Sequence, residues 1–597
     1  MFRKALLTIT IILILIPVTL RAWPSKCEFK DTVDVFGWPE DMTLGQNTRT
    51  FTSDTLYVLV GHCVVEDGQT IYVQPGTVFW GAPTGYSSLH TNYDSDPGAI
   101  IVARGGYAEI VGNASNPVVM TMYGDDVCDP YDKAINIRGQ WGGLIICGYA
   151  RNNSAGGGKS AVGQIEGIED RFYGLYGCEE GVNCDDSDNS GIYQYLSVRH
   201  GGHQISDANE INGITMGAVG YGTTIDHCEV FANLDDGYEW FGGTVGCKYL
   251  IAAYGGDDCF DYDEGYRGLN QFWLACYTTD TGDKNGEHDG GTIPEDDEPY
   301  AIPIILNATY IGGGPDMAAG KNSGIFAMRD NNGGQYINSV FTMGSADFIQ
   351  QLEDVGADPT KDSEWMLRQG NIAFYDNLIM GMANYDGTIA SVITNGGPGE
   401  AQEYVTDYFN GSIGYHGTTN RFLTDGKDVH LENYWWTDWD AAGERLDPRY
   451  VDDLGNEVIN PAPDYTFTQC PPFCEPWWPP DYDPQLTDTD PASYFEVVGY
   501  RGAFGPAAEG NLSALWARSW SHLYERGIFP YICGDVNYDD NVNILDIVAL
   551  INTIYKGGSG YFPIQSGDTN NDGNTNILDI VNIINYKYKA GADLTCP

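Results

Sequence analysis

The sequence predicts a mainly β protein, a parallel β-helix followed by a small α-helical module. Three observations lead to this fold class. Short apolar runs separated by glycine turns fill most of the chain. Near the middle, a motif recurs at a spacing typical of one β-helix coil. At the C-terminus, an oxygen-rich loop that leads into an apolar segment with helical spacing occurs twice.

Composition and charge narrow the classes of partner. The 597 residues include 30 basic and 83 acidic side chains, for a formal net charge of −53. Nucleic acids and anionic membrane surfaces both require a basic binding surface, so we expect neither as a partner. Hydrophobic residues make up 42% of the chain, which is enough for a large core and argues against general disorder. This composition is typical of a secreted, turn-rich β protein whose carboxylates hold cations.

The N-terminus has the pattern of a secretory signal peptide over residues 1–22. Arg3 and Lys4 precede an apolar run that ends at Leu20, and the small residue Ala22 follows. The run is short for a membrane span, which needs about 20 apolar residues. We therefore expect a secreted protein, extracellular or associated with the cell surface, with no membrane insertion after signal cleavage. An uncleaved anchor is the alternative.

The cysteines also indicate an oxidising compartment, because there are 14 of them, an even number. Three local disulfides are plausible: Cys178 with Cys184, Cys470 with Cys474, and Cys533 with Cys596. Free buried thiols are the alternative, above all for Cys147, Cys228, Cys247 and Cys276. A zinc site at the 470–474 pair would lack a second pair of ligands.

The β-helix is expected over residues 23–400. Runs such as Leu56–Val60, Ile71–Val73 and Val78–Trp80 are short and closely spaced, as the sides of stacked coils would be. The strongest support is the repeat: Asp235-Asp236-Gly237-Tyr238-Glu239-Trp240 aligns with Asp257-Asp258-Cys259-Phe260-Asp261-Tyr262. Alternation along a strand would place the aromatic rings on one face and the acids on the other face or nearer the turn. A β-sandwich is the alternative architecture.

Several segments carry a resemblance to a known family. They are Gly139-Gln140-Trp141-Gly142-Gly143, Gly222-Thr223-Thr224-Ile225-Asp226, Asp257 to Gly268, and the closing Ala503-Phe504-Gly505 with Trp516 and Trp520. The chain resembles, over most of 50–350 and 490–528, a family of secreted bacterial proteins predicted to be right-handed β-helices. The resemblance implies a right-handed parallel β-helix and secretion. It implies no particular activity.

Residues 401–490 depart from the coil pattern, and we interpret them as an aromatic and proline-rich insertion or cap. Tyr434-Trp435-Trp436 and Pro476-Trp477-Trp478 supply rings that either stack on sugars or cover the side of the β-helix. Residues 491–530 are expected to form the C-terminal end of the β-helix domain.

Stacked acids are the candidate catalytic site. Glycoside hydrolysis needs one carboxylic acid and a second carboxylate, and many parallel β-helices are polysaccharide lyases or hydrolases. The catalytic candidates are Asp236, Asp257, Asp258 and Asp261, with His200, His203 or Arg267 as partners for substrate charge. A calcium ion held by the stacked carboxylates is an alternative, and solvated turn acids are another.

The C-terminal repeat predicts two calcium loops. Oxygen-bearing side chains occupy positions 1, 3, 5, 9 and 12 of each loop, and a backbone carbonyl is expected at position 7. The predicted Ca²⁺ ligands are Asp535, Asn537, Asp539, Asn541, Asn543 and Asp546 in the first loop, and Asp568, Asn570, Asp572, Asn574, Asn576 and Asp579 in the second. An apolar helix follows each loop.

This module, residues 531–597, resembles a type I dockerin, which implies calcium binding and a cohesin-like protein domain as partner. Two features depart from the usual pattern. Asp540 stands where a glycine makes the turn, and Ile544-Leu545 and Ile577-Leu578 replace the usual hydroxyl-bearing residues. The partner is therefore either a divergent cohesin or another part of the same chain.

Together these features predict a secreted β-helix protein that binds calcium, joins an extracellular assembly and takes part in polysaccharide binding or degradation. A polysaccharide hydrolase or lyase is one alternative, and a passive structural or adhesion protein is the other.

Overall fold

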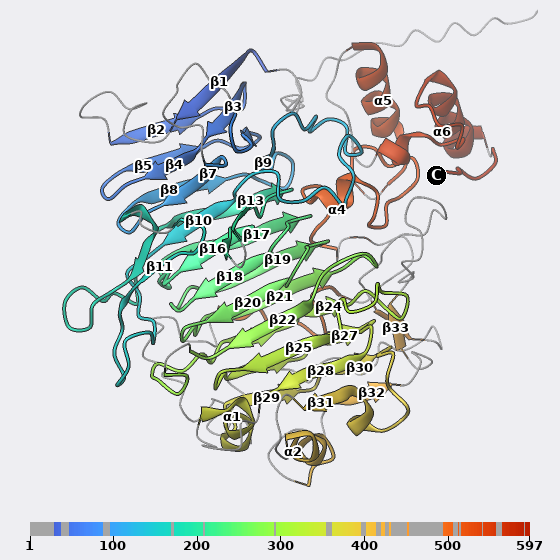
Figure 1. Cartoon of the computed structure of the whole chain (residues 1–597). Coiled ribbons are helices and arrows are strands. Elements are labelled where there is room, and N and C mark those ends of the chain that lie inside the picture. Colours follow the sequence, from blue (N-terminus) through green and yellow to red (C-terminus); the bar gives the residue numbers. More distant parts are fainter. Residues whose placement is uncertain are drawn as a thin grey trace, which may run out of the picture.

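Parallel strands stack in ladders along most of the chain in the computed structural model (Figure 1). The structure describes residues 29–36, 47–86, 96–168, 172–206, 209–291, 294–353, 361–395, 401–412, 420–423, 429–431, 450–452, 494–505, 512, 515–539, 541–556, 564–589 and 591–596. Within them, no helix is long and apolar enough to cross a membrane. The predicted signal peptide and most of 401–490 lie outside the described residues.

One side of the stack is a ten-stranded parallel sheet, sheet B, with one strand from each successive coil. Its strands are β4 (His62–Val65), β7 (Ala99–Val102), β10 (Leu144–Cys147), β16 (Ile214–Gly217), β18 (Tyr238–Phe241), β20 (Phe260–Asp263), β22 (Lys284–Asp289), β25 (Gly324–Arg329), β28 (Asp347–Leu352) and β31 (Ile393–Asn395). Because neighbouring strands belong to consecutive coils, residues at equivalent positions lie directly above one another.

Two further parallel ladders complete each coil, and they merge in four long strands. These strands are β13 (Gly191–Arg199), β17 (Thr224–Phe231), β19 (Cys247–Ala253) and β21 (Leu269–Cys276). The first ladder also contains β2 (Thr48–Phe51), β5 (Thr70–Val73), β8 (Tyr107–Val111), β23 (Ile304–Leu306), β26 (Gly334–Ile337) and β29 (Ile372–Tyr375). The second contains β1 (Asp31–Phe36), β3 (Thr55–Val60), β6 (Val78–Gly81), β9 (Val118–Met122), β24 (Thr309–Ile311), β27 (Val340–Thr342), β30 (Leu378–Met380) and β32 (Arg421–Leu423).

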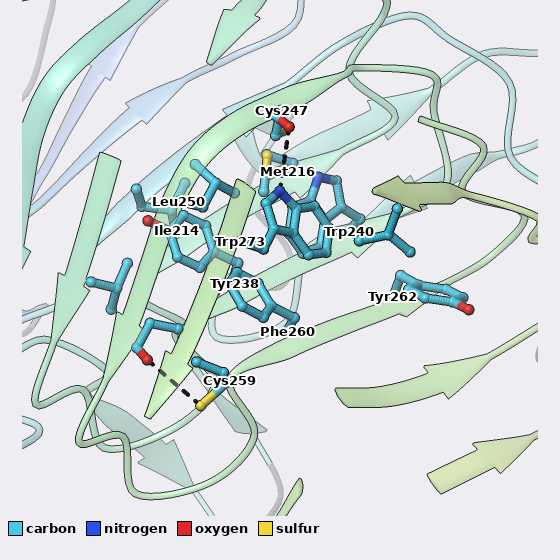
Figure 2. Packing of buried hydrophobic residues seen from close by; sticks show 14 of the residues in the cluster. Ile214, Met216, Tyr238, Trp240, Cys247, Leu250, Cys259, Phe260, Tyr262 and Trp273 are labelled. Atoms are coloured by element: carbon cyan, nitrogen blue, oxygen red, sulfur yellow. Dashed lines mark hydrogen bonds between the residues drawn. The ribbon is translucent and has the colours of Figure 1, made fainter. Parts of the chain in front are cut away.

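The predicted parallel β-helix is thus confirmed, and the β-sandwich alternative is wrong because the coils pair in parallel. Tyr238 pairs with Phe260 and Trp240 with Tyr262, so the two copies of the repeat stack in register on adjacent coils. Their four rings are fully buried inside the coils, as Figure 2 shows. Alternation along β18 and β20 turns the intervening acids to the outer face.

Each long strand bends at one residue with left-handed backbone, and these residues stack. Tyr195, His227, Tyr249 and Phe272 have φ between 50° and 62°. Such a conformation costs about 1–2 kcal/mol for a residue other than glycine. The rings lie 4.5, 4.3 and 4.8 Å apart in succession, and a stacked aromatic pair contributes about 0.5–1.5 kcal/mol. The stack therefore offsets much of the strain at this corner.

Residues 515–525, called the returning segment below, pack against this corner and cover it. Trp516 lies edge-on to His227 and Tyr249, with centroids 5.9 and 5.2 Å apart. It leads to helix α4 (His522–Glu525), where the buried Glu525 binds Arg199 of β13 at 2.9 Å. The C-terminal segment therefore runs back beside the earlier coils (Figure 1).

The remaining elements lie at the edges of the coils or in the C-terminal module. At the edges of the coils are α1 (Ser363–Gln369), α2 (Ala401–Phe409), the 3₁₀ helices Phe172–Gly174 and Ile389–Val392, and three antiparallel pairs: β11 (Val162–Gln164) with β12 (Leu175–Gly177), β14 (Gln204–Ser206) with β15 (Asn209–Glu210), and β33 (Val429–Leu431) with β34 (Tyr450–Asp452). The 3₁₀ helix Ile564–Gly567 belongs to the module. The module contains α5 (Ile544–Lys556) and α6 (Ile577–Lys589), which pack around Leu550 and Ile583.

The cysteine predictions are confirmed where the structure describes them. Disulfides join Cys178 to Cys184 and Cys533 to Cys596, and the second bridge links the two ends of the module. The thiols predicted to be free, at Cys147, Cys228, Cys247 and Cys276, are buried and unpaired. The 470–474 pair lies outside the described residues.

Candidate functional site

The outer surface of sheet B carries a ladder of polar, mostly acidic side chains, called the carboxylate face below. Thr215, Glu239, Asp261 and Glu287 stand in register on β16, β18, β20 and β22. Beside them, the turns before β16, β18 and β20 stack Asn212, Asp236 and Asp258, with Asp235 and Asp257 one residue earlier. Strand alternation explains this face, because the residues that alternate with the acids on β18 and β20 are the buried aromatic rings of the core.

The structure brings the predicted acids together and adds Glu239, Asp283 and Glu287, which the sequence reasoning did not include among the catalytic candidates. Carboxylate oxygens of Asp236, Glu239 and Asp261 lie within 4.8 Å of one another. Asp257 and Asp258 form a neighbouring group with Asp283 within the same limit. Glu239 is the equivalent of Asp261 in the preceding coil, so the repeat itself contained the signal for it.

Burial and mutual repulsion change the protonation of this face. Burial first, and then the charge of Asp257, raise the pKa of Asp235 to about 8. Burial and neighbouring carboxylates also raise the pKa values of Asp236, Glu239, Asp258 and Asp261 well above those of ordinary carboxyl groups. Around neutral pH this face must therefore take up either protons or a cation.

Three oxygens on this face have no hydrogen-bond partner among the described residues. They are Asn212 Oδ1, Thr215 Oγ1 and Asp261 Oδ1. Asn212 and Thr215 are each only 1% exposed, and Asn212 Nδ2 donates to Glu239. Buried polar atoms are normally satisfied, and oxygen atoms are the ligands that hard cations prefer. The residues present therefore fit a calcium-type cation.

A positively charged residue, Arg329, contacts the carboxylate face at β22, the last of its strands. Arg329 of β25 binds Asp289 through two nitrogens, at 2.7 and 3.0 Å, and also binds Glu287. Burial acts to raise the pKa of Glu287, but the bond with Asp258 and the charge of Arg329 outweigh it and lower that pKa. Asp258 and Glu287 therefore lie next to each other with opposite pKa shifts.

The prediction that His200 and Arg267 meet charged groups of a substrate is wrong, because both side chains are buried. His200 is 1% exposed, and its Nδ1 lies 2.6 Å from the carbonyl of Ile137; burial lowers its pKa to about 4. Arg267 is 3% exposed and binds Asp186 at 3.2 Å. Both are structural groups. His203 is half-buried, with its ring nitrogens 3.0 Å from Gly139 O and Thr84 Oγ1.

The acidic surface continues into the last coils, and this predicts a pH dependence of stability. Burial raises the pKa of Glu353 to about 7 and that of Asp330 to about 6. Because these folded-state values exceed the unfolded ones, the stability that they contribute is complete below about pH 4 and is lost as pH rises through 6 to 7. With a chelator present, we expect the contribution of these two groups to the free energy of unfolding to fall by on the order of 2 kcal/mol between pH 5 and pH 8, after allowance for partial exposure.

Thermal unfolding of the full chain across this pH range measures the effect. Glu353→Gln should reduce the slope, because that variant cannot titrate at this position. A free energy of unfolding that rises with pH in chelator would contradict the assignment.

The two predicted calcium loops share a pair of internal hydrogen bonds. Asp546 accepts from Val536 N at 2.9 Å and from Asn543 N at 2.7 Å, while Asp579 accepts from Thr569 N and Asn576 N, both at 2.8 Å. Oxygens of Asp535, Asp539 and Asp546 lie within 4.8 Å of one another. The first loop therefore presents converging carboxylate oxygens, which fit calcium. Asp540 lies outside the described residues.

The helices after these loops expose the apolar pairs that the sequence places at loop positions 10 and 11. Ile544 and Leu545 are 54% and 55% exposed, and Ile577 and Leu578 are 54% and 56% exposed. Large apolar side chains with this exposure are typical of a protein-binding surface.

Comparison with protein families finds two matches. A model described as "Pectate-lyase like beta helix domain" matches residues 43–378, and one described as "Dockerin type I domain" matches residues 533–586. Neither the curated proteins nor the solved structures contain a match to this chain.

Proposed function

Because the chain belongs to the family of pectate-lyase-like β-helix domains and carries a type I dockerin domain, we propose that it is a calcium-binding component of an extracellular, cellulosome-type assembly that acts on polysaccharides. The observation that carries this proposal is the pair of matched loops, each followed by a helix with an exposed apolar pair. The dockerin supplies attachment, and the β-helix supplies the surface that meets the glycan.

Attachment would depend on calcium. The twelve predicted loop residues would hold one ion in each loop, and the ions would fix the loops and so the two helices. Dockerin domains bind cohesin domains, so a cohesin-like domain is the partner. The exposed Ile-Leu pairs favour a cohesin whose contact surface is apolar at these positions.

The carboxylate face is the proposed polysaccharide-facing site. Asp236, Glu239 and Asp261 would hold a cation together with the oxygens of Asn212 and Thr215. Such an ion would remove the repulsion among these buried carboxylates. Since a chain of charge −53 repels an acidic glycan, a neutral glycan or a cation-bridged acidic glycan is the expected ligand.

Neutralising this face tests the cation site. In Asp236→Asn/Glu239→Gln/Asp261→Asn, we expect higher stability than wild type in chelator, because the variant removes three buried groups that must otherwise be protonated or remain charged on folding. Calcium should stabilise the wild-type β-helix by about 2–3 kcal/mol at saturating concentration and should barely affect the variant. Differential scanning calorimetry of the full chain, with and without calcium, measures both effects.

The matched control replaces three exposed acids, Asp67→Asn/Asp126→Asn/Glu179→Gln, and should behave as wild type. If calcium stabilised the triple variant of the carboxylate face as much as the wild type, the ion would not lie on this face.

A second candidate function, hydrolysis or lysis of a polysaccharide, is favoured by Asp258 and Glu287. A protonated acid beside an ionised carboxylate is the pairing that general acid–base chemistry needs. Screening of neutral and acidic glycans for reducing ends or unsaturated products would detect turnover. Loss of that turnover in Asp258→Asn and in Glu287→Gln, with glycan binding retained, would support catalysis. Absence of both binding and turnover would favour a passive structural or adhesion role.

A further inference from the structure

The first calcium loop makes a contact that extends beyond the dockerin module. Arg518, which precedes helix α4, binds Asp535 with its Nη2 3.0 Å from Oδ2. Asp535 occupies position 1 of the loop, and its side chain is fully buried. A group on the β-helix side of the boundary thus holds a predicted calcium ligand.

The neighbouring Tyr538 adds a packing contact at the same boundary. Its ring lies 6.0 Å from that of Tyr524 in α4, and the Arg518 guanidinium lies 5.9 Å from its centroid. Tyr538 packs both against the cluster of the body that contains Trp520 and against the core of the module around Leu550. One loop side chain therefore joins two hydrophobic cores.

The second loop serves as an internal comparison, because its equivalent residues differ. Asp568, at position 1, accepts a hydrogen bond from Gly573 N within its own loop, at 2.8 Å. The acceptor is Oδ2, the same atom that contacts Arg518 in Asp535. Position 4 is Asn571, which shares the left-handed backbone of Tyr538, with φ of 54° and 61°, but has no ring. Contact with α4 thus depends on residues that only the first loop has.

We propose that calcium binding to the first loop and docking of the module on the β-helix are coupled, with Arg518 and Tyr538 as the positioning residues. Without the ion, the carboxylates of Asp535, Asp539 and Asp546 repel one another and the loop opens. Opening displaces Asp535 and Tyr538, which make the contacts with Arg518 and helix α4. With the ion, the loop holds both groups in place, and Arg518 acts as an outer-shell partner of the ligand. By linkage, docking must in turn strengthen calcium binding.

This inference rests on the calcium binding proposed above, but not on a cohesin-like partner. The docked arrangement leaves Leu545 and Leu578 more than half exposed. Docking on the body and binding of an external protein therefore use different surfaces of the module.

The experiment compares the full chain with Arg518→Gln and Tyr538→Asn, the second of which introduces the side chain of loop two. Small-angle X-ray scattering, in calcium and in chelator, reports the maximum dimension. Peptide-resolved hydrogen–deuterium exchange during a calcium titration gives a separate affinity for residues 535–546 and 568–579. Lys587→Gln, which removes an exposed positive charge of the module, is the control.

We expect the wild-type chain to lengthen when calcium is removed. Both variants should be long even in calcium, with the first loop about tenfold weaker and the second loop unchanged. Calcium binding to both loops without any change in dimension, or equal affinities in wild type and variants, would overturn the coupling alone. Loops that bind no calcium at all would overturn the proposed function as well.

Discussion

Replacement of Trp240 by alanine is expected to lower the free energy of unfolding of the β-helix by about 3–5 kcal/mol. Trp240 is fully buried at the centre of the coil interior. Its ring stacks on Tyr266 at 5.2 Å, and on Trp273 at 5.1 Å and Tyr238 at 5.9 Å, the last two of which are labelled with it in Figure 2. Removal of the indole deletes all of these contacts at once.

The cavity would not close, because the backbone around it is fixed. β18 lies between β16 and β20 in a ladder whose register is set by its neighbours, so the coils cannot move together without breaking strand pairing. Protein interiors of this kind relax only partially around a cavity. Phenylalanine at position 240 fills part of the space, and we expect that variant to cost about half as much.

Calorimetry of the full chain in calcium measures this loss. Phe172→Ala is the matched control, because Phe172 is 68% exposed and its truncation should change stability by no more than about 0.5 kcal/mol. Equal effects of the two substitutions would mean that Trp240 does not belong to a rigid core.

The sequence predicts the coil stack best where the two copies of the repeat keep one constant offset. Asp236 aligns with Asp258, and Trp240 pairs with Tyr262, because the same offset relates both pairs. The carboxylate face also includes Thr215, which pairs with Glu239, and Glu287, which pairs with Asp261, and both of these pairs have a larger separation along the chain. Turns of unequal length shift these members out of any fixed repeat, so sequence comparison alone does not align them.

Contacts of the returning segment are harder still to predict. Arg199 and Glu525 form a buried ion pair across 326 residues, and neither lies in a motif that identifies the other. The contact between Arg518 and Asp535 spans only 17 residues, yet it also escapes local patterns, because a calcium loop specifies its own ligands and not their outer partners. In contrast, the two loops are predicted from spacing alone, since the pattern of oxygen-bearing residues lies within about twelve consecutive positions.

Substitution of both position 12 ligands, Asp546→Ala with Asp579→Ala, is expected to abolish calcium-dependent folding of the module. Each carboxylate is fully buried and accepts hydrogen bonds from backbone N–H groups at the start and at the end of its loop. Alanine therefore removes a predicted metal ligand and leaves those donors unpaired, which costs about 1–3 kcal/mol for each buried donor. In small metal-dependent modules, the binding free energy is folding free energy, so α5 and α6 should lose their calcium-dependent protection.

Hydrogen–deuterium exchange over residues 544–556 and 577–589 measures this protection, and pull-down of cohesin-domain proteins in calcium measures attachment. Asp593→Ala, an exposed acid of the same module, should retain both. The Cys533–Cys596 disulfide remains in the double variant, so a loss of protection would report the missing ion rather than separation of the two ends of the module. Single variants separate the contributions of the two loops to exchange protection. Asp579→Ala should leave the docked first loop protected, whereas Asp546→Ala should release the first loop from the β-helix. Calcium-dependent protection that survived in the double variant would mean that the ions bind elsewhere in the chain.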